Sequence, residues 1–418
     1  MRRIGLLALL LAPAIGLARD PAPAHPEVKA FPTRSSEPVA VNEVPVPARQ
    51  GWWTVHKVDG QPYDAAALRG AKALDLDPAY VQAVRDDLQL VFERDYDGAR
   101  AAFHGLDNRF PGTGIGSAVD AVVWQAIMLE NWDYRYEAQY FEANTKAQAQ
   151  IEAALDKNPD SGWEHFLLAG MKGIQAIHTT RRGKYLAALQ LALDAMSEAG
   201  KAREAAPEFT DLLLADGMYN YWRTVVTQSN RFLPDFGDNR KEGLGQMQTV
   251  EQQGIFLGPP ATLSLAFSYI EEGQMGPALR QCRRNQRVYP DNIINLLVVG
   301  QVLTFTHRYD DALATWDHIQ RVDPTNQRVL YWRGVTLLRA SRSADAIASL
   351  QAYLGSGYLE PEHRAWAQYR LGEAYYRQKR YAVAEAAYEA AVKVNGHKPA
   401  KAALARMHRM RKDGAIRY

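Results

Sequence analysis

Residues 366–388 read WAQYRLGEAYYRQKRYAVAEAAY, and their pattern predicts the helical fold. Gly372 stands inside an apolar helical pattern, Ala384 follows twelve residues later, and Tyr388 follows four residues after that. Two antiparallel helices approach closely only where both present small side chains, so Gly372 and Ala384 mark a helix crossing. The stretch therefore predicts a helix hairpin, with the larger Tyr388 filling the space beside the crossing.

The same pattern recurs upstream. A small residue stands at Ala266, Gly300 and Gly334, so that the spacings up to Gly372 are 34, 34 and 38 residues. Each is followed twelve residues later by an alanine and four residues further on by a larger side chain, at Ala278 and Cys282, Ala312 and Trp316, and Ala346 and Leu350. Pro290 and Pro324 close the first two units, because proline ends a helix. One hairpin cannot bury its apolar faces alone, so the repeated hairpins must stack.

The last unit resembles the tetratricopeptide repeat. The positions that match the consensus are Leu371, Gly372, Tyr375, Tyr381, Ala384, Tyr388 and Ala391, while Gln368 stands where the consensus has tryptophan. The resemblance implies an all-α fold, an α-solenoid of stacked antiparallel hairpins with a superhelical course. The chain is similar to exported bacterial proteins of this type, and this similarity implies no particular activity.

The register divides the chain into regions. Four repeats are expected at residues 259–398, and a capping helix with a basic tail at residues 399–418. Residues 65–258 show the same hairpin spacing, but they match the repeat less well and contain insertions, including an aromatic loop from Trp132 to Phe141. Together the two regions are expected to form about eight hairpins.

The amino-terminal residues predict export. Arg2 and Arg3 precede an apolar run and the small residues Gly16 and Ala18, so residues 1–18 are expected to be a signal peptide cut after Ala18. Ala24 is a second candidate for the cleavage site, and a membrane anchor is the alternative to a signal peptide. The protein is then periplasmic or secreted. Residues 19–64 combine a proline-rich flexible arm with an amino-terminal cap. Cys282 is the only cysteine, so an intramolecular disulfide is excluded.

Charge argues against nucleic acid as a partner, because the net formal charge is only +2. The charge is uneven, however, since residues 364–418 hold 13 Lys and Arg against 4 Asp and Glu. This basic end is either a peripheral contact to an anionic envelope surface or a solvated last repeat.

Catalytic motifs are absent from the sequence. The ten histidines form no zinc-binding spacing, and there is neither a Gly-x-Ser-x-Gly elbow nor a phosphate-binding Gly-Lys-Ser/Thr motif. We therefore predict no catalytic residue, no metal and no cofactor, and a non-enzymatic adaptor of the cell envelope.

The resemblance implies that the first helix of each hairpin faces a concave groove. Aromatic and arginine side chains there are typical of binding hot spots. The expected contacts to a protein or peptide partner are Phe267, Gln301, Phe305, Arg328, Tyr331, Arg339, Trp366, Tyr369, Tyr376 and Arg377. Some of these can instead pack between hairpins, and the partner's identity and the oligomeric state stay open.

The main alternative is an envelope glycan-binding protein or enzyme that uses residues 124–256. Its aromatic side chains could stack on sugars, namely Trp132, Tyr134, Tyr136, Tyr140, Tyr219, Tyr221 and Trp222. A structural subunit of an envelope complex is a third possibility.

Overall fold

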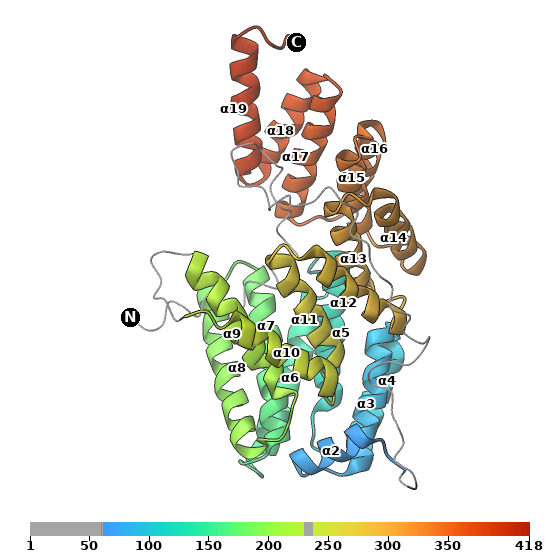
Figure 1. Cartoon of the computed structure of the whole chain (residues 1–418), viewed down its shortest axis with the longest axis vertical. Helices are drawn as coiled ribbons and strands as arrows, with labels where there is room; N and C mark the ends of the chain where they lie inside the picture. Colours follow the sequence, from blue (N-terminus) through green and yellow to red (C-terminus); the bar gives the residue numbers. More distant parts are fainter. Residues whose placement is uncertain (1–59, 61, 230–236) are drawn as a thin grey trace. The chain divides into compact units, whose positions relative to one another are not determined.

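The computed structural model describes residue 60, residues 62–229 and residues 237–418, and its regular elements are all α-helices (Figure 1). No β-strand occurs among these residues, which confirms the predicted all-α fold class. The predicted signal peptide and the proline-rich arm up to residue 59 lie outside the described residues. The helices are α2 (Ala65–Leu74), α3 (Pro78–Glu93), α4 (Tyr96–Arg109), α5 (Ile115–Asn131), α6 (Glu137–Leu155), α7 (Gly162–Arg181), α8 (Tyr185–Ala205), α9 (Leu212–Ser229), α10 (Arg240–Gln253), α11 (Gly258–Glu271), α12 (Met275–Val288), α13 (Ile293–Phe305), α14 (Tyr309–Val322), α15 (Arg328–Arg339), α16 (Ser343–Leu354), α17 (Pro361–Arg377), α18 (Tyr381–Asn395) and α19 (Lys398–Lys412).

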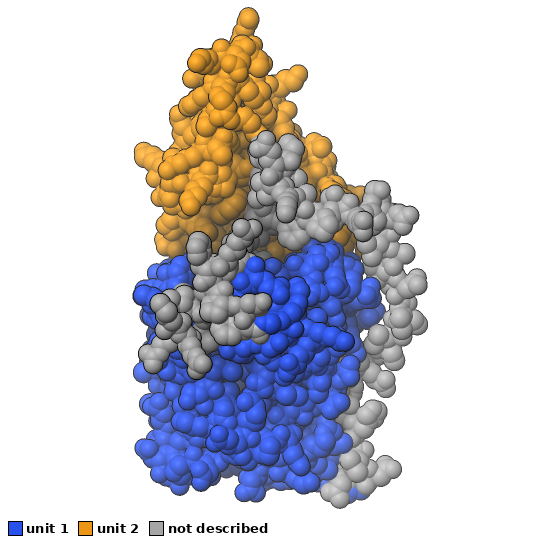
Figure 2. Space-filling view, turned by 60° about the vertical axis from the view of Figure 1, so that its left-hand side comes forward, with its two compact units in different colours: residues 1–126, 136–292 blue, residues 127–135, 293–418 orange. Residues whose placement is uncertain are grey.

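The described chain forms two compact units, coloured separately in Figure 2. Among the described residues, unit 1 comprises those up to Ala126 and those from Tyr136 to Asn292, and unit 2 comprises Ile127–Arg135 and Ile293–Tyr418. The first of the four predicted repeats, α11 with α12, therefore belongs to unit 1. Unit 2 holds the other three hairpins and α19, together with a short piece of chain from the end of α5.

One expectation about the divergent half was wrong. The aromatic loop from Trp132 to Phe141 is shorter than predicted, because α6 begins at Glu137 and takes in Tyr140 and Phe141. Tyr140 is fully buried, and its spacing to Ala143, Ala147 and Ile151 continues the apolar face of this helix by one turn.

Unit 1 fixes the start of α11 with a buried carboxylate. Asp211, 1% exposed, accepts hydrogen bonds from the backbone N–H groups of Ile255 (2.6 Å), Phe256 (2.7 Å) and Leu257 (2.6 Å). These amides directly precede the helix and would otherwise lack partners. Asp211 therefore has a structural role.

The hairpins of unit 2 cross where the sequence places small residues. A Cβ added to Gly334 would lie 2.6 Å from Leu350 Cγ, and one added to Gly372 would lie 2.6 Å from the ring of Tyr388. An added Cβ on Gly300 would overlap the ring of Trp316. Each glycine thus meets the larger side chain that the repeat register assigns to it, which confirms the predicted crossings.

Among the described residues, no helix is both long and apolar enough to cross a membrane.

Candidate functional site

The first helices of the three hairpins in unit 2, α13, α15 and α17, pack side by side. The hydroxyl oxygens of Thr304 and Thr336 lie 2.8 Å apart across α13 and α15. Arg377 Nη1 donates a hydrogen bond of 2.5 Å from α17 to the carbonyl oxygen of Leu338 in α15. The capping helix α19 continues the series, since the Tyr376 hydroxyl contacts Met410 Sδ at 3.3 Å. These helices form a row of neighbours.

Two arginine side chains lie over aromatic rings near the carboxyl ends of these first helices. The guanidinium of Arg339 lies 4.8 Å from the ring centroid of Phe305, and that of Arg406 lies 5.5 Å from the ring centroid of Tyr376. Arg377 is exposed, whereas the other four are half-buried. Because aromatic faces attract cations, the rings hold these guanidinium groups in place. We call Phe305, Arg339, Tyr376, Arg377 and Arg406 the arginine–aromatic row.

The amino ends of α15 and α17 are covered by a piece of the same chain. This piece, Ile127–Arg135, is called the Trp132 segment. Helix α5 ends at Asn131, and Trp132 then adopts a left-handed backbone conformation with φ 63°. Its indole stacks on the imidazole of His363 with ring centroids 3.8 Å apart, and the guanidinium of Arg328 lies 4.7 Å from the indole centroid.

Side chains of α15 and of the turn before it hold the Trp132 segment through hydrogen bonds to its backbone carbonyl oxygens. Arg328 Nη1 donates to the carbonyl oxygen of Leu129 at 2.7 Å, and Asn326 Nδ2 donates to that of Glu130 at 3.2 Å. Trp132 is 8% exposed and also contacts Tyr331, with ring centroids 5.4 Å apart. The amino ends and the carboxyl ends of the first helices thus differ, because the Trp132 segment covers the amino ends of α15 and α17.

The comparison with known families decides the nature of these hairpins. A family model described as "Tetratricopeptide repeat" matches residues 300–361, 360–403 and 369–413. Residues 300–413 are tetratricopeptide repeats. Such repeats generally mediate protein–protein interaction.

Solved structures similar to the chain include further tetratricopeptide-repeat proteins. A tetratricopeptide repeat protein from Parabacteroides merdae shares 13% identity, with 68% of this chain and 98% of that chain covered and a TM-score of 0.42. Yeast Tom70 shares 14% identity, with 83% and 85% covered and a TM-score of 0.41. MamA of AMB-1 shares 17%, with 44% and 97% covered and a TM-score of 0.32. No curated protein sequence matches the chain.

The structure separates the predicted partner contacts into three groups. Phe267 lies on α11 in unit 1, half-buried against the apolar cluster around Tyr221. Four lie on the first helices of the tetratricopeptide repeats and are buried, namely Gln301, Arg328, Tyr331 and Tyr369. Five lie on the same helices and are half-buried or exposed, namely Phe305, Arg339, Trp366, Tyr376 and Arg377. Their contact with a partner stays a prediction.

Two members of the buried group are engaged by the Trp132 segment. Arg328 and Tyr331 contact Trp132, which sequence reasoning placed in an unrelated loop. Sequence reasoning also missed Arg406, because it lies in the capping helix beyond the repeat register. Arg406 lies three positions before Arg409 in a basic helix, and nothing in that sequence indicates that its guanidinium lies over the ring of Tyr376.

Two buried histidines of unit 1, His165 and His178, have a hydrogen-bonding partner at each ring nitrogen. His165 Nδ1 lies 2.7 Å from Glu198 Oε2, and its Nε2 lies 2.9 Å from the carbonyl oxygen of Pro159. His178 is likewise held between Gln125 Oε1 at 3.1 Å and Glu137 Oε1 at 2.8 Å. Burial lowers the pKa of His178, although the hydrogen bond to Glu137 opposes this shift. Neither imidazole offers a ring nitrogen to a substrate.

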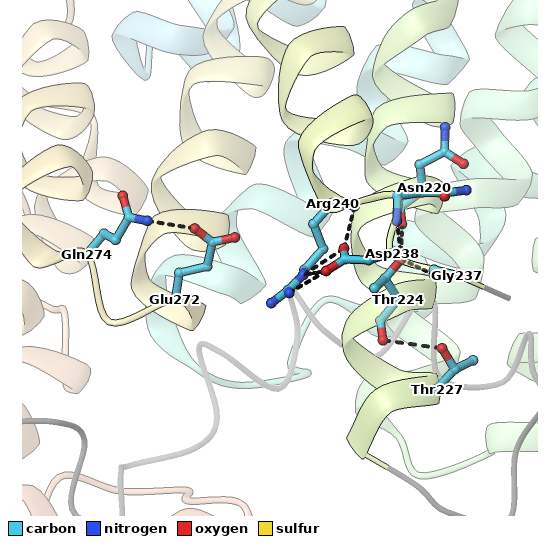
Figure 3. Close-up of polar contacts among 9 residues, drawn as sticks. Asn220, Thr224, Thr227, Gly237, Asp238, Arg240, Glu272 and Gln274 are labelled. Carbon is cyan, nitrogen blue, oxygen red and sulfur yellow. Dashed lines mark hydrogen bonds and ion pairs between the residues drawn. The ribbon is translucent and has the colours of Figure 1, made fainter. Parts of the chain in front are cut away.

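A polar cluster lies at the start of α10 (Figure 3). Asp238 accepts a hydrogen bond from the backbone N–H of Arg240 at 3.1 Å and pairs with its guanidinium at 2.5 Å. The hydrogen bond from the Arg240 side chain lowers the pKa of Asp238 to about 2. Thr224 Oγ1 accepts from the backbone N–H of Asn239 at 3.1 Å. These contacts fix the backbone at the start of α10.

The aromatic side chains that favoured a glycan site are largely inaccessible. Trp132, Tyr140, Tyr221 and Trp222 are all buried, with exposed fractions of 8, 0, 0 and 3%. A sugar needs an exposed ring face to stack on, so these four do not supply one. No group of three or more His, Cys, Asp or Glu side chains in the described part of the chain is arranged to hold a metal ion.

Proposed function

We propose that this chain is a non-enzymatic adaptor that binds a peptide or protein partner on the first-helix row of its tetratricopeptide repeats. The observation that carries the proposal is the arginine–aromatic row. Arg339 and Arg406 are held over the rings of Phe305 and Tyr376, so their guanidinium groups lose little freedom when a partner binds. Aromatic and arginine side chains in such settings dominate binding energy at interfaces.

The location of the contact follows from the Trp132 segment. Because this segment already covers the amino ends of α15 and α17, the partner meets the carboxyl ends, where Arg377 is exposed. Tyr369 is 5% exposed and is a poor reporter of binding, whereas Arg377 and Tyr376 are suitable positions.

Site-specific photo-crosslinking tests the adaptor proposal. A photoreactive amino acid at position 376 or 377 is expected to capture one identifiable protein in intact cells. The matched control is position 351 on the second helix α16, where Gln351 is also exposed. Capture of the same proteins from positions 351 and 377, or no specific capture from position 377, would refute the proposal.

We further propose that the adaptor works in the bacterial cell envelope. Support comes from the basic start, apolar run and small residues of positions 1–18. Mass spectrometry of the protein from fractionated cells tests this location. An envelope fraction containing chains that begin at Arg19 supports export, and an uncleaved cytoplasmic chain contradicts it.

A further inference from the structure

Charge is divided unequally between the helices of unit 2. The first helices α13, α15 and α17 and the capping helix α19 together hold twelve Lys and Arg but only two Glu. The second helices α14, α16 and α18 hold two Lys and Arg and six Asp and Glu. One of the two Glu in the first group, Glu373, pairs with Arg370 at 2.7 Å. The first-helix row is therefore basic, and the second helices are acidic.

The repeat register aligns the arginines. Phe305, Arg339 and Arg377 each lie five residues after the crossing glycine of their hairpin, at Gly300, Gly334 and Gly372. Equivalent positions in successive hairpins follow one another along the packed helices, as the contact from Arg377 to the carbonyl oxygen of Leu338 shows. Arg406 of α19 extends the series beyond Tyr376. The cationic groups thus follow one another across α15, α17 and α19, with Arg339 over the ring of Phe305 and Arg406 over the ring of Tyr376.

A structural role alone accounts for part of this pattern. Arg339 and Arg377 are the last residues of α15 and α17, where a cation stabilises the negative end of the helix dipole. That role does not require an aromatic ring under Arg339 or a third arginine in α19. It also does not account for the absence of Asp and Glu from α13, α15 and α19.

We propose that the partner presents an acidic segment, a flexible stretch rich in Asp or Glu with an apolar side chain, to the arginine–aromatic row. This inference rests on the proposed adaptor function and names the chemistry of its partner. Guanidinium groups bind carboxylates with paired, directional hydrogen bonds. The rings of Phe305 and Tyr376 offer the apolar contact beside them. Like-charged second helices repel such a segment, so charge selects the face as well as the partner.

Fluorescence anisotropy with the full chain tests the inference. The probe is a labelled, flexible peptide that contains several Glu and a Leu, and the reference probe has Gln in place of each Glu. The test variant combines Arg339→Gln, Arg377→Gln and Arg406→Gln, because glutamine retains a donor at each site. The control combines Arg321→Gln and Lys393→Gln, which removes the two Lys and Arg of the second helices. Thermal unfolding of both variants reports whether they remain folded.

The expected result is binding of the Glu peptide that the test variant weakens about tenfold or more, given the usual strength of exposed ion pairs. The control variant is expected to bind within about twofold of the unchanged chain, because screened distant charges contribute little. Raising NaCl from about 0.05 M to about 0.5 M should weaken the unchanged chain and leave the residual binding of the test variant nearly unaffected.

Three outcomes would overturn the inference. They are equal affinity for the Glu and Gln peptides, equal loss in the test and control variants, and tighter binding of single-stranded DNA or anionic vesicles through the same arginines. The adaptor proposal is judged separately by crosslinking at position 377. A partner that is captured there, and whose binding the test variant leaves unchanged, removes the acidic-segment inference alone. Absence of specific capture removes the adaptor proposal as well.

Discussion

Replacing Trp132 by alanine tests how far the Trp132 segment stabilises the tetratricopeptide repeats of unit 2. The indole is 8% exposed and contacts Tyr331, Trp332 and His363, while the guanidinium of Arg328 lies 4.7 Å from its centroid. A buried tryptophan removes on the order of 200 Å² from water, which corresponds to about 5 kcal/mol at ~25 cal/mol per Å². This area estimate is an upper bound, and large-to-small changes in cores cost about 3–5 kcal/mol. We expect a local loss of about 3–4 kcal/mol.

Hydrogen exchange read by mass spectrometry is the suitable assay, because the two units of the chain need not unfold together. Trp132→Ala should accelerate exchange in peptides from 326–335 and 361–367, which contain the contacts of the indole, and leave α19 nearly unchanged. The control is Tyr358→Ala, since Tyr358 is 67% exposed and its loss should cost less than about 0.5 kcal/mol. Equal exchange at 326–335 in Trp132→Ala and Tyr358→Ala would refute a stabilising role for the segment.

Three further predictions concern packing and titration. Gly372→Ala places a Cβ 2.6 Å from the ring of Tyr388 and should destabilise unit 2 by about 1–3 kcal/mol in a urea titration. The control is Gly170→Ala in α7, where an added Cβ meets no atom within 4 Å, and this change should be neutral or stabilising. Burial, and secondarily Arg370, lowers the pKa of His397 to about 4, so folding favours its neutral form. The stability of α19 should then fall by about 1–2 kcal/mol as the pH drops from about 6.5 to about 4. His397→Asn keeps an acceptor for the Ala400 N–H and should abolish this pH dependence of the stability of α19, as measured by hydrogen exchange. If the stability of α19 in the variant still falls with pH as in the unchanged chain, His397 is not the source of the pH dependence. Burial raises the pKa of the fully buried Cys282 thiol to about 12, so a thiol reagent should label it only after unfolding, and rapid labelling of the native chain would contradict its burial.

The repeat register could be predicted because it depends on local sequence. Gly334 and Gly372 meet Leu350 and Tyr388 at the positions that spacing alone assigns, since a close helix crossing leaves no choice but a small residue. Such features involve residues close in the sequence, and their periodicity is visible in one chain.

The Trp132 segment could not be predicted in this way. Trp132 and Tyr331 are about two hundred residues apart, and no period connects them. The burial of Arg328 and Tyr331 therefore depends on a non-local contact. Repeat position alone cannot distinguish them from Arg339 and Arg377 on the same helices. The structure makes that distinction, because it shows which end of the row another part of the chain covers.

Protection of the chain by its captured partner would show whether the partner binds the arginine–aromatic row. Hydrogen exchange should be compared for the chain alone and for its complex with the protein crosslinked at position 377. Binding to this row should slow exchange at the carboxyl ends of α13, α15 and α17 and around Arg406 in α19. Protection confined to the second helices α14, α16 and α18, or to unit 1, would contradict it.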